Sequence, residues 1–145
     1  MDLASYNFPI FEAPLKYQSN PSIVALEFKS KIISSDGIII VTPEYNGSIP
    51  ASLKNVIDLL YEEWQGKFIA FSTASSGGFG GLEALTHLQF IFWKMQAWTF
   101  TANFPVSKVQ DKFDDLGIPT NKQETDEYAQ IFINEFLNCI KSNQK

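Results

Sequence analysis

The sequence predicts an α/β domain, in which a parallel sheet carries helices on both faces. Two short apolar runs, 38–41 and 68–71, have the composition of strands that are buried on both sides. Each run is followed by a polar or glycine-rich loop and then by an apolar helical pattern, at 50–61 and 82–96. Strand, loop and helix repeated in this order are typical of parallel sheets with right-handed crossovers.

The rest of the chain fits one domain, 1–145, without internal repeats. Residues 1–20 hold Pro9 and Pro14 and predict an extended connection. A helix is expected at 21–33, with Asn20 as its N-cap and Pro21 in the first helical position. The remaining expected elements are a third strand at 98–102, a loop or partly helical stretch at 106–121 and a closing helix at 124–141.

Composition excludes several classes of protein. With 145 residues, 45% of them apolar and 19% charged, the chain has the size of an ordinary domain and enough material for a core. A net charge of -5 argues against binding to nucleic acid or to anionic membranes. No apolar run approaches the roughly 20 residues of a membrane helix, and no secretory leader opens the chain. We therefore expect a cytoplasmic domain with no nucleic acid and no membrane among its partners.

Two loops are the candidates for a ligand site, because ligands of open α/β sheets bind outside the carboxyl ends of the strands. Loop 42–50 supplies an aromatic ring, an amide and a Gly-Ser turn. Loop 72–81 has four glycines, which let a flat ligand approach main-chain N–H groups, and it leads into a helix N-terminus with unpaired donors. With one His and one Cys in the chain, a planar heterocycle fits better than a metal.

Simpler interpretations remain open for both loops. Glycines that open a helix often form only a tight turn, and neither a dinucleotide nor a P-loop fingerprint is present. The first loop is also compatible with a plain strand-to-helix connection, with Ser48 as cap and Pro50 in the first turn. His87 has no Ser, Cys or acid at triad spacing, and Ser75 lacks a visible base, so no protein catalytic residue is expected.

Residues 36–60 show a family resemblance. Their sequence, DGIIIVTPEYNGSIPASLKNVIDLL, closely resembles the signature of the NAD(P)H-dependent FMN reductases, which include quinone, azo-dye and chromate reductases. Residues 75–82 resemble the family's glycine-rich flavin loop, and 113–117 and 125–127 resemble its ending. The resemblance implies a flavodoxin-like sheet with FMN at its C-terminal edge, NADPH or NADH as electron donor, and a small acceptor such as a quinone. The chemistry would belong to the flavin.

The resemblance also implies which residues bind the flavin and where subunits meet. A homodimer or homotetramer would form through the helix that holds Asn55 and Asp58. The implied flavin-binding residues are Pro43, Glu44, Tyr45, Asn46, Gly47, Ser75, Gly77, Gly78 and Gly80.

One departure from the family pattern stands out. Family members begin with a strand, a Ser/Arg-rich phosphate loop, a helix and a second strand, whereas residues 2–9 already resemble the segment after that second strand. The sequence thus predicts an N-terminally truncated fold in which strand 38–41 has an open edge. Three interpretations stay open: part of a longer protein, a gene model that starts at an internal Met, or a degenerate relative that pairs edges in a dimer. The rival function is a non-catalytic flavodoxin-like remnant that acts through subunit or partner contacts.

Overall fold

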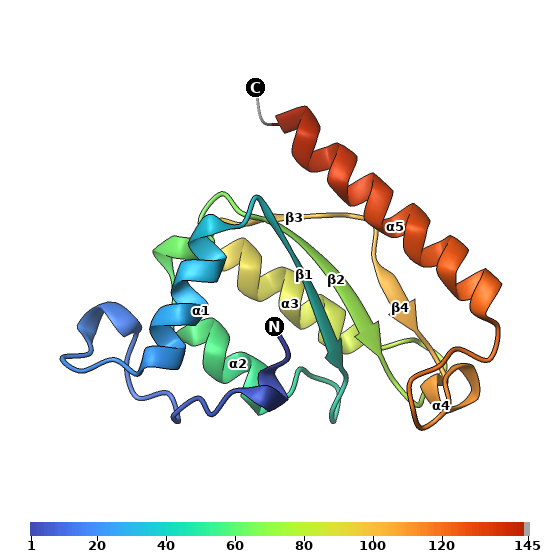
Figure 1. Ribbon diagram of the computed structural model, residues 1–145, viewed down its shortest axis with the longest axis horizontal. Helices are drawn as coiled ribbons and strands as arrows, with labels where there is room; N and C mark the ends of the chain where they lie inside the picture. Colours follow the sequence, from blue (N-terminus) through green and yellow to red (C-terminus); the bar gives the residue numbers. More distant parts are fainter. Residues whose placement is uncertain (144–145) are drawn as a thin grey trace.

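A parallel sheet lies between two helical layers in the computed structural model, which describes residues 1–143 (Figure 1). Strand β2 is central and pairs on one side with β1 and on the other with β3 and β4, all in parallel. The predicted α/β sheet is confirmed. The strands are β1 (Gly37–Pro43), β2 (Phe68–Ala74), β3 (Trp98–Thr99) and β4 (Phe104–Val106).

Helices cover the two faces unequally. Three helices and the turn η3 pack against one face, and α5 alone packs against the other, where Phe132, Phe136 and Ile140 meet Ala70 of β2. Among residues 1–143, no helix combines the length and the apolar character needed to cross a membrane. The helices and turns are η1 (Leu3–Ser5), η2 (Leu15–Tyr17), α1 (Ile23–Ser34), α2 (Ala51–Asp58), η3 (Glu62–Trp64), α3 (Leu82–Lys94), α4 (Val109–Lys112) and α5 (Lys122–Asn143).

Strand β2 is buried on both faces, as its composition predicts, but the same expectation for β1 is wrong. Ile40 and Thr42 of β1 are buried, whereas Ile39 is 38% exposed and Val41 is 75% exposed. Side chains alternate along a strand, and α5 reaches this face of β1 only near Gly37, whose missing Cβ leaves room for Ile140 and Phe136. Within the described chain, the outer edge of β1 pairs with no strand, as expected.

The third strand differs from its prediction. Two short strands, β3 and β4, replace the expected strand 98–102, and both lie along the same side of β2. Phe104–Val106 was not predicted as a strand, and it contains Pro105, which cannot donate to a ladder. The carbonyl of Val106 accepts from the amide of Ser75, just after β2, so the backbone groups of Val106 face β2. Backbone groups alternate in direction along a strand, so those of Pro105 face away from β2, where no ladder bond requires an N–H.

Helix starts also differ from the sequence signals. The N-cap of α1 is Ser22, whose side chain accepts from the Ala25 amide, and not Asn20. Helix α2 begins at Ala51 with Pro50 as its cap residue and ends at Asp58, three residues earlier than predicted. Ser48 does not cap α2, because its hydroxyl contacts α3 instead. Helix α4 confirms the expected partly helical stretch after β4.

The core under β1 and β2 centres on Trp64. Its ring makes edge-on contacts with Phe28 of α1 and Phe92 of α3, and its indole N–H donates to the carbonyl of Ile57 at 3.1 Å. Buried aromatic pairs in this geometry stabilise a core beyond their area alone. Turn η3 therefore joins three helices on one face of the sheet.

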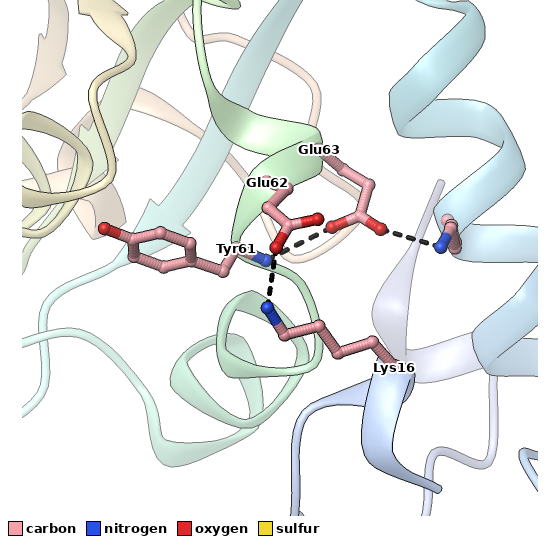
Figure 2. A network of polar contacts seen from close by, with 5 residues as sticks. Lys16, Tyr61, Glu62 and Glu63 are labelled. Atoms are coloured by element: carbon pink, nitrogen blue, oxygen red, sulfur yellow. Dashed lines mark hydrogen bonds and ion pairs between the residues drawn. The ribbon is translucent and has the colours of Figure 1, made fainter.

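Two ion pairs flank η3 at the surface. Figure 2 shows the Lys16 ammonium directed at Glu62 and the Glu63 carboxylate directed at the backbone amide of Tyr61. Lys16 Nζ and Glu62 Oε1 lie 2.6 Å apart. Glu63 also pairs with Lys29 of α1 at 2.8 Å. Partial burial alone would raise the pKa of the Glu63 carboxyl, but hydrogen bonds from Lys29 and from the backbone amides of Glu63 and Tyr61 outweigh it and lower this pKa below 4.5.

Glu63→Gln should lower the free energy of unfolding by about 0.5–1 kcal/mol at pH 7, because the Glu63 side chain is only 15% exposed and pairs with α1. A carboxyl whose pKa is lowered by folding stabilises the protein above its unfolded pKa and loses that effect as pH falls through the folded pKa. The difference between the two proteins should thus shrink below pH 4.5, which urea unfolding at two pH values measures. Glu62→Gln, at a 64% exposed side chain, is the control and should change stability less. Equal losses, or a pH-independent difference, would contradict this role.

Candidate functional site

The two candidate loops lie side by side, as predicted. Strands β1 and β2 run in register from Gly37 opposite Phe68 to Pro43 opposite Ala74, so both chains leave the sheet at the same edge. The amide of Glu44 donates to the carbonyl of Ala74 at 2.8 Å, one residue beyond that last pair. The loops therefore share one edge, and we call the surface between the segments 43–48 and 75–80 the slot.

The first side of the slot is a tight hairpin. Tyr45 and Ser48 exchange two backbone hydrogen bonds, at 2.9 and 3.0 Å, around Asn46 and Gly47. Both central residues have positive φ, 51° and 71°, as in the type I′ turns that Asn-Gly pairs favour. The Tyr45 ring is 62% exposed, so the hairpin presents an aromatic face to solvent.

Glu44 links this hairpin to α3. Its Oε2 accepts from the amides of Glu83 and Ala84, at 3.1 and 3.2 Å. A carboxylate is favourable there, because the first amides of a helix are unpaired and carry positive potential. These α3 donors are not free for a ligand, which corrects the expectation from the sequence. The backbone amide of Glu44 is not free either, because it donates to Ala74.

The glycines on the second side divide into two pairs. Gly80 and Gly81 are buried with φ of 63° and 83°, and an added Cβ would lie 2.9 Å from Pro105 and 2.8 Å from Thr73. Packing alone therefore requires glycine at these two positions. Gly77 and Gly78 are exposed, and an added Cβ at Gly78 would meet nothing within 4 Å. Only this second pair leaves the backbone open to a flat ligand.

The segment after β4 braces the glycine-rich loop from behind. The amides of Lys108 and Val109 donate to the carbonyls of Gly77 and Ser75, at 2.9 and 3.0 Å, and the Ser75 amide donates to Val106 at 3.0 Å. Ser75 Oγ also lies 3.4 Å from the Gly77 carbonyl oxygen. The loop is thus held in place by main-chain bonds, and its side toward Gly78 stays open.

One contact at the slot was missed by the sequence. Ser48 Oγ and His87 Nδ1 lie 2.9 Å apart, although the residues are 39 positions apart in the chain. The expectation that His87 has no serine nearby is therefore wrong in space. No local signal joins the two residues, because the contact depends on the pairing of β1 and β2 that places the hairpin beside α3.

The predicted flavin-binding residues thus gather at one edge, but their contact with a flavin stays a prediction. They lie outside a separate hollow of about 550 Å³, which is lined by residues of β4, the segment after α4 and the first half of α5. The slot is an open surface next to exposed Tyr45 and Phe79 rather than an enclosed cavity. Within the described residues, no group of three or more His, Cys, Asp or Glu side chains is placed to hold a metal ion.

Comparison with known proteins gives one family. The model of the NADPH-dependent FMN reductase family matches residues 1–111, a span that includes the whole slot. A quinone reductase from Pseudomonas putida is 28% identical over 145 residues, which covers 95% of this chain and 76% of that protein. A quinone reductase from Escherichia coli K12 is 31% identical over 113 residues, which covers 74% of this chain and 60% of that protein.

Higher identity is confined to a shorter stretch. An NAD(P)H-dependent FMN reductase from Schizosaccharomyces pombe is 46% identical over 69 residues, which covers 46% of this chain and 34% of that protein. The chain therefore spans less than two thirds of two of these three relatives.

Solved structures agree with the fold. FerB from Paracoccus denitrificans, described as a flavoenzyme NAD(P)H:(acceptor) oxidoreductase, superimposes with a TM-score of 0.73 at 26% identity, over 94% of this chain and 76% of that one. An oxidoreductase from Corynebacterium diphtheriae shares the fold with a TM-score of 0.69 at 16% identity, over 89% and 68%. The predicted flavodoxin-like fold is confirmed.

Proposed function

The chain belongs to the NADPH-dependent FMN reductase family, and from this premise we propose that it binds FMN in the slot and acts as an NAD(P)H-dependent oxidoreductase with a quinone-type acceptor. The observation that carries the proposal is the shared edge of the two loops, where Pro43 lies opposite Ala74 and an exposed Tyr45 lies near an open glycine pair. The named activities of the relatives, FMN reductase and quinone reductase, support the same reaction class.

The residues of the slot fit a flat, polar-edged ring. Gly77 and Gly78 have no side chains and no atoms crowding the Cβ position closer than 3.8 Å, so a ring can approach their main chain. The Glu44 carboxylate accepts from two amides of α3, where the positive potential of the helix N-terminus offsets part of its charge. Bound FMN would supply the redox chemistry, taking hydride from NADPH or NADH and passing electrons to the acceptor. The chain itself would hold and orient the ring.

FMN uptake tests the proposal. The purified chain is mixed with FMN, freed of excess flavin, and examined for visible flavin absorbance and for bleaching by NADPH in the absence of oxygen. Retained flavin that NADPH bleaches, and that a benzoquinone then restores, is the expected result. A colourless chain that takes up no FMN would refute the proposal and favour the rival, a non-catalytic remnant that acts through protein contacts.

Two glycine variants localise the binding. Gly78→Ala places a methyl group on the open side of the loop and should weaken FMN binding at least roughly tenfold, while the free energy of unfolding stays the same or rises by up to about 1 kcal/mol. Gly80→Ala is the matched control: at φ 63° and against Pro105 it should lower the free energy of unfolding by about 1–3 kcal/mol. Unchanged FMN affinity in Gly78→Ala would place the flavin elsewhere.

We also propose that two copies associate beside α2, as a homodimer or as half of a homotetramer. Phe90 and Trp93 of α3 are 62% and 66% exposed, and Phe90 lines the same hollow as Asp58 of α2. Asn55 takes part only indirectly, because its side-chain amide bonds the backbone of Pro9 and Phe11. Exposed aromatic patches of this kind mark interaction surfaces.

Light scattering tests this association. A dimer or tetramer is expected for the wild-type chain, and Phe90→Glu should dissociate it because a carboxylate cannot be buried unpaired. Leu116→Glu, at an exposed apolar residue elsewhere, is the control and should leave the mass unchanged. A monomeric wild type, or a Phe90→Glu chain of unchanged mass, would refute this surface.

A further inference from the structure

The hairpin that forms one side of the slot has two anchors on the same helix. Glu44, just before the hairpin, accepts from the amides of Glu83 and Ala84. Ser48, the last residue of the hairpin, has its hydroxyl 2.9 Å from Nδ1 of His87. His87 lies four and three residues after these two amides, so both anchors lie within the first two turns of α3.

The hairpin between these anchors is a compact, cross-bonded turn. Its two cross-bonds join Tyr45 to Ser48, and its central residues occupy the left-handed region that a type I′ turn requires. The chain before the hairpin is held through Glu44, and the residue after it, Ile49, is buried in the core. The His87 contact adds a side-chain bond at Ser48, at the base of the hairpin on the side opposite to Tyr45 in the cross-bonded pair.

We propose that His87 is a positioning residue of the slot: through Nδ1 it holds Ser48 and so fixes the hairpin that presents Tyr45 and Asn46 to the ligand. The proposal rests on the proposed flavin-binding function. The contact serves with either tautomer, since Nδ1 accepts from the Ser48 hydroxyl when Nε2 carries the proton and donates to it otherwise. Because His87 and Tyr45 are both exposed, the contact orders the slot locally and adds little to overall stability.

Variants that keep or remove the polar atom at the contact test this role of His87. His87→Asn keeps a polar atom at the place of Nδ1, whereas His87→Leu removes it at similar size, and Ser48→Ala removes the other partner. Thr86→Val is the matched control, because Thr86 is the exposed neighbour on α3 and its hydroxyl bonds only to Leu82 within the helix.

Hydrogen exchange of the ligand-free chain measures the anchor directly. The amides of Tyr45 and Ser48 should exchange faster in His87→Leu and in Ser48→Ala, and at the wild-type rate in His87→Asn and Thr86→Val. Midpoints of thermal unfolding should stay alike, which separates local loosening from loss of fold. Wild-type exchange rates in His87→Leu, or equal acceleration in Thr86→Val, would overturn the proposal.

FMN affinity measures the consequence. His87→Leu and Ser48→Ala should each weaken FMN binding roughly three- to tenfold, the value of one hydrogen bond, and the double variant should lose no more than either single one. His87→Asn should bind like the wild type. Additive losses in the double variant would overturn the proposal. A wild-type chain that takes up no FMN would refute the proposed function, while the exchange rates would still support or overturn the His87 anchor.

Discussion

The parallel register of β1 on β2 is the constraint on which the rest of the structure depends. The two strands pair residue by residue until Pro43 and Ala74, and the Glu44 amide adds a last bond to Ala74. A slip of one residue would turn the side chains of β1 to the opposite face and would move the Glu44 carboxylate away from α3. Register thus determines both the core and the position of the slot.

Pairing in this register places chemistry from distant segments together. Glu44 and Ser48 belong to one loop, yet their side chains end on α3, which follows the other loop. The segment behind β4 then holds Ser75 and Gly77 by their backbone. Three separate parts of the chain therefore keep the slot in shape, and the open backbone at Gly77 and Gly78 is the part that they leave for a ligand.

Much of the fold could be predicted from local signals. The β-branched run 38–41 and the run 68–71 marked the strands correctly, and the loops that follow them were expected to meet. The predictions that were wrong concern features that depend on contacts between distant residues. Ile39 and Val41 have the composition of buried residues, but only their neighbours decide whether that face is covered. Strand β4 has only three residues and contains Pro105, and a proline fits a strand only where no neighbouring strand needs its N–H, so its pairing with β2 could not be read from local signals.

The site was predictable in position but not in detail. Loop composition indicated a ligand at this edge, whereas the use of Glu44 as a cap, the Ser48–His87 contact and the packing role of Gly80 all depend on which residues the register brings together. Residues 77–81 include four glycines that a sequence cannot tell apart. The space available to an added Cβ distinguishes the two that are packed, Gly80 and Gly81, from the two that are open, Gly77 and Gly78.

Hydrogen exchange with and without FMN tests most directly whether the two loops form one ligand slot. We expect FMN to slow exchange at both sides together, at the amides of the 45–48 hairpin and of residues 77–79, while amides of the α5 face keep their rates. Protection of only one loop, or protection confined to the hollow between β4 and α5, would contradict it.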